Sequence, residues 1–287
     1  MADLLPMIES ALDAACLWDS DCPQRLAAAM RYSLLAPGKR LRPAMVLMAS
    51  EAVGGRPEDA LVAAVAIEMV HAYSLVHDDL PAMDDDDLRR GRPTTHVAFD
   101  EATAILAGDA LLAAAFEQLA TAPLAPQLVV DCLRTLAFAA GSQALVGGQA
   151  DDLAAEKDDE QTVARLEGIH RRKTGSLFDA AVRLGGLLGS APPESLSALA
   201  AYSRPLGLAF QVVDDCLDYT STSETLGKRV GKDEARGKLT YPGLLGLDEA
   251  KQKAAALVRE SLSAVEVFGD AAWRLRWLAQ FVLDRSR

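Results

Sequence analysis

Two groups of aspartates in the sequence have the types and spacing of metal ligands. The first lies in HDDLPAMDDDDLRR at residues 77–90, where six aspartates precede two arginines: Asp78, Asp79, the run 84–87, Arg89 and Arg90. Carboxylate oxygens are the ligands that Mg²⁺ prefers, and the ion usually shares its shell with substrate phosphates. An arginine binds phosphate oxygens through paired hydrogen bonds. This segment therefore suits a metal-bound phosphate ester.

The position of Pro81 decides whether the first aspartates share one ion. Apolar residues before it recur every three or four positions, which predicts a helix, at Val62, Val65, Met69, Tyr73 and Val76. Pro81 removes a backbone donor and crowds the preceding turn, so the helix should end near Asp78. In an unbroken helix Asp84 would lie about 240° around from Asp78. The break allows Asp84 to fold back.

The second group lies in FQVVDDCLDY at residues 210–219. Asp214 and Asp218 project from one helix face about 40° apart. Like charges in such an apolar segment are unfavourable without a cation, so the two groups predict a shared site with several metal ions. The alternative for residues 84–87 is a solvated loop without a ligand, which is how most acidic runs behave.

Together these motifs resemble the first and second aspartate-rich motifs of the trans-isoprenyl diphosphate synthases. They look most like those of the bacterial farnesyl diphosphate synthases, in which the first motif has two extra residues. The resemblance extends from GKRLRP at 38–43 to the end of the chain. It implies an all-α isoprenoid synthase bundle around a central cavity. It also implies Mg²⁺, with three ions expected and Mn²⁺ possible, held by Asp78, Asp79, Asp84, Asp214 and Asp218.

The resemblance also implies two diphosphate sites. Isopentenyl diphosphate would be held by Lys39, Arg42, His71 and Arg90, whereas Arg40 has no clear role. The allylic diphosphate would meet Arg89, Lys173, Thr174, Gln211 and two lysines of a polar segment, Lys228 and Lys238. Gln149 and Asp152 match family residues that face the cavity. Outside this resemblance, His71 would be an ordinary core residue and Lys173 and Thr174 part of an ordinary helix end before Gly175.

Tyr73, with Ser74 beside it, lies five residues before Asp78, where the resemblance places the limit on chain length. An aromatic ring there would leave no volume for another isoprene unit, although Tyr73 could simply belong to the core. The expected activity is synthesis of farnesyl diphosphate, by Mg²⁺-dependent head-to-tail condensation of isopentenyl diphosphate with dimethylallyl and geranyl diphosphate. The alternatives are a geranylgeranyl diphosphate synthase, a terpene cyclase of the same fold and a silent partner subunit. The DDCLD sequence at 214–218 counts against a cyclase, and the intact aspartate pairs count against a silent subunit.

Composition favours one all-α domain spanning residues 1–287. The chain is 50% hydrophobic and only 5% aromatic, and alternating strand-like runs are scarce. A net charge of -12 argues against a nucleic-acid partner and against general binding to an acidic membrane surface.

The remaining expectations concern location and assembly. No basic, signal-like segment is visible at the start, and the nearly uncharged run 136–150 is too short to span a membrane. Four cysteines without metal-ligand spacing favour a reducing, cytoplasmic location. Helices within 101–150 are apolar nearly all round, so we expect buried core and, from the family resemblance, a homodimer. Trp273, Trp277, Leu278, Phe281 and Val282 should also be core.

Overall fold

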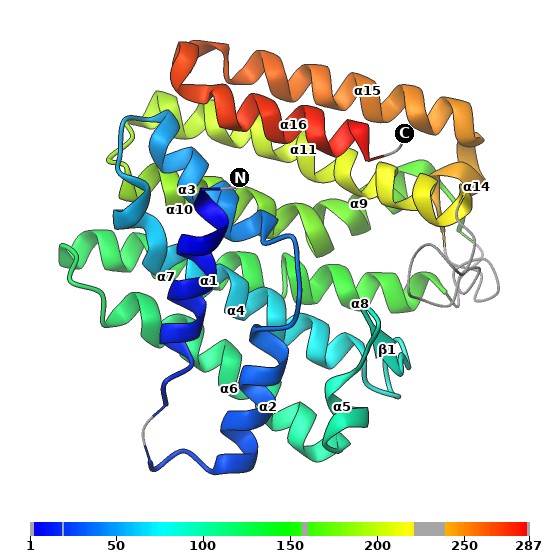
Figure 1. Ribbon diagram of the computed structural model, residues 1–287. Helices are drawn as coiled ribbons and strands as arrows, with labels where there is room; N and C mark the ends of the chain where they lie inside the picture. Colours follow the sequence, from blue (N-terminus) through cyan, green and yellow to red (C-terminus); the bar gives the residue numbers. More distant parts are fainter. Residues whose placement is uncertain (1–2, 19, 157–159, 221–238, 286–287) are drawn as a thin grey trace.

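A computed structural model describes residues 3–18, 20–156, 160–220 and 239–285 of the chain. Helices make up nearly all of the described structure (Figure 1), which confirms the all-α prediction. The helices before the first aspartate motif are α1 (Leu4–Ala15), α2 (Gln24–Leu34), α3 (Leu41–Ala52), the 3₁₀ turn η1 (Pro57–Ala60) and α4 (Leu61–Asp78).

The helices between the two motifs include the apolar ones. They are α5 (Thr95–Ala98), α6 (Glu101–Ala120), α7 (Pro126–Ala140), α8 (Leu145–Ala155), α9 (Val163–His170), the π-helix η2 (Arg171–Gly175), α10 (Ser176–Leu188) and α11 (Pro193–Thr220). Those after the second motif are α14 (Tyr241–Leu245), α15 (Leu247–Ala264), η3 (Glu266–Ala272) and α16 (Trp273–Asp284).

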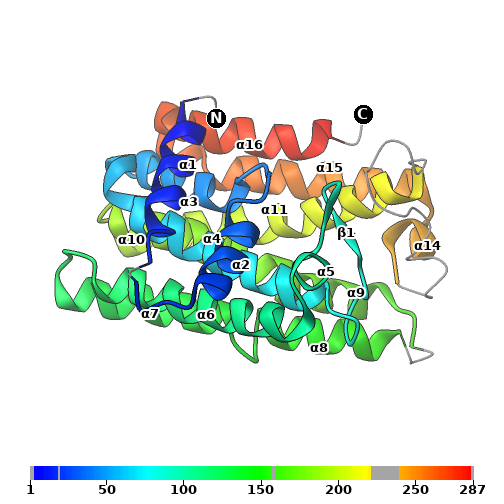
Figure 2. The ribbon, with the colours of Figure 1, turned by 60° about the horizontal axis from the view of Figure 1, so that its bottom comes forward.

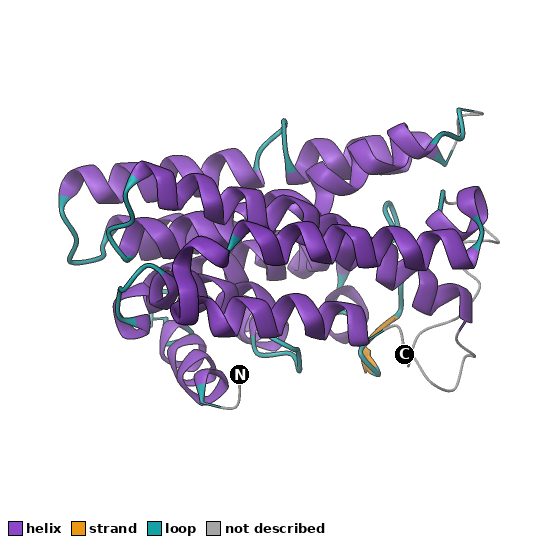
Figure 3. Ribbon diagram, turned by 90° about the horizontal axis from the view of Figure 1, so that it is seen from above, coloured by secondary structure: helices purple, strands orange, loops and turns teal. Residues whose placement is uncertain are grey.

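The long helices run in similar directions and stack in layers, while α1 and α2 cross them on one side (Figures 2 and 3). The largest cluster of buried apolar residues draws members from Leu4 in α1 to Val282 in α16. Such a continuous core supports the prediction of one domain, which stays a prediction. Within the core, Tyr202 of α11 donates its hydroxyl hydrogen to the carbonyl of Leu275 in α16 at 2.7 Å.

Helix α4 positions the first aspartate motif and confirms the predicted helix end. Val65, Met69, Tyr73 and Val76 are buried, and the helix ends at Asp78, three residues before Pro81. Its apolar face packs along α6 and α3. The catalytic candidates at its end are therefore carried on a rigid, enclosed element.

A short hairpin then places the two arginines of the first motif. Strands β1 (Leu88–Arg89) and β2 (Arg92–Pro93) pair antiparallel, with Arg89 opposite Arg92. The two turn residues between them, Arg90 and Gly91, have φ values of 55° and 74°. Positive φ at both positions identifies a type I′ turn, which suits the twist of a two-residue hairpin. The turn directs Arg89 toward Asp79 and Arg90 toward the carbonyl of Pro37.

Two expectations about the core were wrong in part. Ile105 and Leu106 of α6 and Phe138 of α7 are 44%, 57% and 63% exposed. Trp273 and Trp277 of α16 are exposed as well, whereas Leu278 and Val282 are buried. Helical spacing predicts which residues share a face, but here the two tryptophans of α16 are exposed, while Phe281 is partly buried and packs against the core.

Three helical stretches, 57–78, 101–120 and 126–155, have the length and composition of a membrane span, a wider set than the run 136–150 suggested. In the first, 72% of the most apolar window is buried inside the protein, which accounts for its composition. In the other two only 39% and 33% is buried. Helices α6 and α7 therefore carry apolar surface that the described chain does not cover.

Candidate active site

The first aspartate motif folds back on the end of α4, as predicted. The backbone N–H of Asp84 donates to the carbonyl of Asp78 at 2.8 Å, and that of Asp86 donates to the carbonyl of Asp79 at 3.2 Å. Asp85 takes a left-handed φ of 47° at the bend. The fold-back brings Asp84 close enough to Asp78 for the two carboxylates to repel each other.

The surroundings of Asp78 disfavour its negative charge, and a nearby cation would stabilise it. Burial raises its pKa to about 6, with Asp84 and Asp79 adding to the effect and Lys173 and Arg89 opposing it. A raised carboxyl pKa means that the charged form is disfavoured at this position. A cation bound there would favour the ionised form further.

Asp79 already has a partner. Both of its carboxylate oxygens accept from Arg89 Nε, at 2.7 and 2.9 Å, and Arg89 Nη2 lies 2.5 Å from Oδ1. The Asp79 side chain is only 4% exposed. This buried pair holds Arg89 against α4, so the role of Asp79 as a metal ligand stays a prediction with a competing partner.

A π-helix carries Lys173 and Thr174 between α9 and α10. Its i→i+5 pattern continues the helix and does not end it before Gly175, and such bulges are frequent at functional sites. The Thr174 hydroxyl donates to Gln211 Oε1 at 2.9 Å, and Gln211 Nε2 lies 3.4 Å from Asp214 Oδ2. Lys173 Nζ lies 2.7 Å from Asp152 Oδ2. The π-helix is thereby linked to the second aspartate motif.

Arg285 is a site residue that the sequence did not single out. Its Nη2 donates to Asp214 Oδ1 at 2.6 Å, and its guanidinium lies 4.5 Å from the ring centroid of Phe210. Its Nε and Nη1 are buried without a hydrogen-bond partner among the described residues. Only the basic composition of residues 284–287 hinted at this contact.

The predicted residues for isopentenyl diphosphate gather beside these aspartates. Arg42 Nη1 lies 3.3 Å from His71 Nε2, and the Arg42 guanidinium lies 5.3 Å from the Phe178 ring centroid. Burial lowers the pKa of Arg42 to about 10, and burial followed by Arg42 lowers the pKa of His71 well below its usual value.

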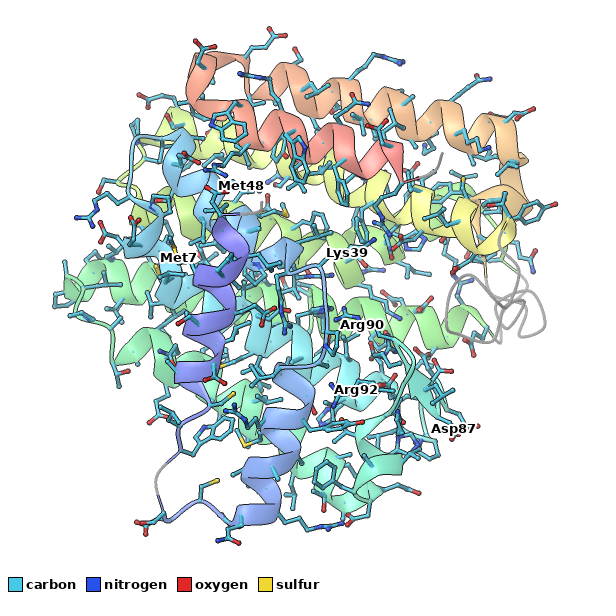
Figure 4. The ribbon with its side chains drawn as sticks, in the orientation of Figure 1. Met7, Lys39, Met48, Asp87, Arg90 and Arg92 are labelled. Carbon is cyan, nitrogen blue, oxygen red and sulfur yellow. The ribbon has the colours of Figure 1, made fainter. Side chains whose placement is uncertain are left out.

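Lys39 and Arg90 face the same side of the molecule (Figure 4). The pKa of Lys39 is lowered first by desolvation and then by Arg285, while Asp214 opposes this and Arg90 adds to it. Arg90 Nη1 donates to the carbonyl of Pro37 at 2.6 Å. Arg40 is buried instead against Glu9 and Glu68, at 2.8 Å from each, so its charge is already compensated.

The other predicted residues differ in what the structure shows of them. Asp218 is exposed one turn beyond Asp214, and Lys228 and Lys238 fall outside the described residues. Gln149 is buried, and neither of its amide atoms finds a hydrogen-bond partner within the described chain. Among the described residues, no three His, Cys, Asp or Glu side chains converge closely enough to hold an ion.

Tyr73, the predicted limit on chain length, is buried on α4. It is 5% exposed, and its ring meets the ring of His77 edge-on at a centroid distance of 5.8 Å. Its hydroxyl is buried without a partner among the described residues. Ser74, also buried, donates to the carbonyl of His71 at 2.9 Å.

Comparisons with known proteins identify the family of this chain. The pattern of the polyprenyl synthetase family matches residues 23–270. The chain is 47% identical over 263 residues to a chloroplastic geranylgeranyl pyrophosphate synthase of Capsicum annuum, covering 91% of this chain and 71% of that protein.

Two solved structures share the fold. A FPP/GFPP synthase from Zymomonas mobilis has a TM-score of 0.87 at 38% identity, covering 98% of this chain and 99% of that one. A geranylgeranyl pyrophosphate synthetase from Pyrococcus horikoshii has a TM-score of 0.89 at 33% identity, covering 98% and 96%. The chain therefore belongs to the polyprenyl synthetase family, the trans-isoprenyl diphosphate synthases, and is a prenyltransferase.

Proposed function

We propose that this prenyltransferase joins isopentenyl diphosphate to dimethylallyl and geranyl diphosphate and releases farnesyl diphosphate. The observation that carries the farnesyl product is the buried ring of Tyr73 on α4, one turn before Asp78. Incubation with dimethylallyl and isopentenyl diphosphates plus Mg²⁺, followed by dephosphorylation and identification of the alcohols, tests the proposal.

The aspartates suit a divalent metal, which the family uses. Their donors are carboxylate oxygens, which Mg²⁺ prefers, and burial disfavours the charge of Asp78 unless a cation is near. We propose three Mg²⁺ ions held by Asp78, Asp84 and Asp214, with Asp218 beside them. Bound there, the ions would neutralise the diphosphate that leaves the allylic substrate.

The chain's own cations divide into two groups in this proposal. Arg89 and Lys173 bind the allylic diphosphate, and both of their charges oppose the effect of burial on the pKa of Asp78. Lys39, Arg42, His71 and Arg90 bind isopentenyl diphosphate. Thr174 and Gln211 line the space between, where their oxygens face the developing allyl cation. Fixed charges of this kind stabilise the departing anion without reorganisation.

The metal assignment predicts a loss of turnover in single variants. Asp78→Ala and Asp214→Ala should each reduce kcat by far more than tenfold, because each removes a ligand of the same cluster. Both variants should also bind Mn²⁺ more weakly, which the paramagnetic relaxation of water protons measures. An unchanged thermal transition would show that the fold is intact, and a loss below about tenfold, roughly 1.4 kcal/mol of barrier, would contradict the shared cluster.

The two cation groups predict different kinetic defects. Lys39→Ala should raise KM for isopentenyl diphosphate, because Lys39 lies beside Arg90 and Asp214. Lys173→Ala should mainly impair the allylic substrate, because Lys173 acts on Asp78. Steady-state kinetics with each substrate varied in turn measures both. Equal effects on both substrates would remove the basis for separate sites.

Geranylgeranyl diphosphate is the second candidate product. The named relatives favour it over farnesyl diphosphate, since the Capsicum annuum and Pyrococcus horikoshii proteins carry that name. The Zymomonas mobilis structure is named for farnesyl and longer products. We keep farnesyl diphosphate as the main proposal because product length depends on local volume next to the tail, and Tyr73 occupies that volume with an aromatic ring.

Tyr73→Ala should lengthen the product by at least one isoprene unit, because it removes the ring and leaves a cavity. Tyr73→Phe is the matched control: it keeps the ring and removes a hydroxyl that has no hydrogen-bond partner among the described residues, so the product should not change. Chromatography of the dephosphorylated products measures both. If wild type yields mainly geranylgeraniol, or if Tyr73→Ala yields only farnesol, Tyr73 is not the limit.

We also propose a homodimer joined through α6 and α7, in the cytoplasm. Ile105, Leu106, Val130 and Phe138 expose apolar side chains on these two helices, and contiguous apolar surface of this kind marks interaction sites. Sedimentation velocity should give twice the chain mass, and Phe138→Glu should shift the protein toward monomer. A stable, active monomer of the wild type would refute the dimer, and cell fractionation tests the location.

A further inference from the structure

The proposed wall residue depends on a neighbour for its position. The Tyr73 ring is perpendicular to the His77 ring, with an interplanar angle of 81° and a centroid distance of 5.8 Å. An edge-to-face contact of this kind contributes about 0.5–1.5 kcal/mol beyond buried area. Because the Tyr73 hydroxyl has no hydrogen-bond partner among the described residues, no polar contact fixes the ring. Packing within the core, which includes the contact with His77, therefore sets its orientation.

His77 is in turn fixed from α6. Its Nε2 lies 3.0 Å from the carbonyl oxygen of Ile105. A carbonyl oxygen only accepts, so Nε2 carries the proton and donates it. Asp109 Oδ1 lies 3.8 Å from the same nitrogen. The imidazole thus spans the interface between α4 and α6, with one edge toward Tyr73 and the other toward the α6 backbone.

The position of the His77 ring against α6 requires glycine at position 108. A Cβ atom added to Gly108 would lie 2.1 Å from His77 Nε2 and 2.5 Å from Cδ2, far inside van der Waals contact. Gly108 lies inside α6 and is buried. Glycine inside a helix costs about 1 kcal/mol relative to alanine, so helix propensity does not favour it here. The close approach of His77 supplies the reason.

We infer that Gly108 and His77 are specificity-determining residues that set product length together with Tyr73. Gly108 opens the space on α6 that seats His77, and His77 holds the ring of Tyr73 across the path of the prenyl tail. Neither residue touches the reacting atoms, so both are positioning residues. The inference rests on the proposed function, because it assigns the α4–α6 contact a role in the same product choice.

A double-mutant cycle on product length tests this assignment. His77→Ala should raise the ratio of the next longer product to the wild-type product about fivefold or more, because the Tyr73 ring loses its edge support. Gly108→Ala should change the same ratio about threefold or more, because the new methyl group displaces the imidazole. In the His77→Ala background, Gly108→Ala should have almost no further effect, since coupled neighbours are non-additive.

The control is Gly168→Ala in α9, where the nearest atom to an added Cβ is 4.0 Å away, so product length should not change. Urea unfolding of each variant shows whether it is folded; if Gly108→Ala alone does not fold, the His77→Ala and double variants still give the comparison. An unchanged product ratio in His77→Ala would overturn the inference. So would an equal effect of Gly108→Ala in both backgrounds. Wild-type protein that forms no prenyl diphosphate would instead contradict the proposed function.

Discussion

Negative charge placed at the end of a buried helix is the constraint on which the rest of this site depends. Helix α4 is apolar almost throughout, yet it ends in Asp78 and Asp79, and burial raises the pKa of Asp78 to about 6. Leaving a charge buried and unpaired costs several kcal/mol. Two cations offset these charges. Arg89, at the type I′ hairpin, pairs with Asp79. Lys173, in the π-helix, lowers the pKa of Asp78 against the effect of burial.

An excess of positive charge occurs on the side of the site that holds Arg42 and His71. Burial, and then the charge of Arg42, lower the pKa of His71, and burial lowers the pKa of Arg42 itself. Asp214 offsets part of this positive charge by pairing with Arg285, although two nitrogens of Arg285 remain without a partner among the described residues. A site with excess anionic groups on one side and excess cationic groups on the other suits a metal-bound diphosphate. In the proposed function, the metal would be held on the first side and the phosphate oxygens on the second.

The sequence was sufficient to predict what depends on local rules. Pro81 predicted the end of α4 and the fold-back of Asp84, since proline excludes a helical donor wherever it occurs. Helical periodicity predicted α4 and its buried residues. The same periodicity did not predict which face of α16 meets the core. Trp273 and Trp277 have the helical spacing of core residues, yet both are exposed.

Contacts between distant segments were beyond sequence reasoning. Asp79 was expected among the metal ligands, but its pairing with Arg89 depends on the path of the hairpin. The contact of Arg285 with Asp214 joins residues 71 positions apart, and no local pattern encodes it. Gly108 resembled any other glycine in an apolar helix until the structure placed His77 against it. These contacts follow from how the helices pack, which motifs at single positions do not specify.

Product length depends both on the sequence motifs and on how the helices pack. An overall identity of 47% reports a shared fold and shared chemistry, because most residues of a bundle serve its core. In our proposal, the length of the prenyl tail depends instead on the volume left beside Tyr73, where α4 packs against α6. There a few side chains suffice, since close-packed interiors accommodate an added group only by displacing a neighbour. Relatives named for geranylgeranyl diphosphate therefore do not exclude a shorter product here. If Tyr73 limits the product as proposed, the packing of Tyr73, His77 and Gly108 acts directly on that volume, and these residues then bear on the product more directly than overall identity does.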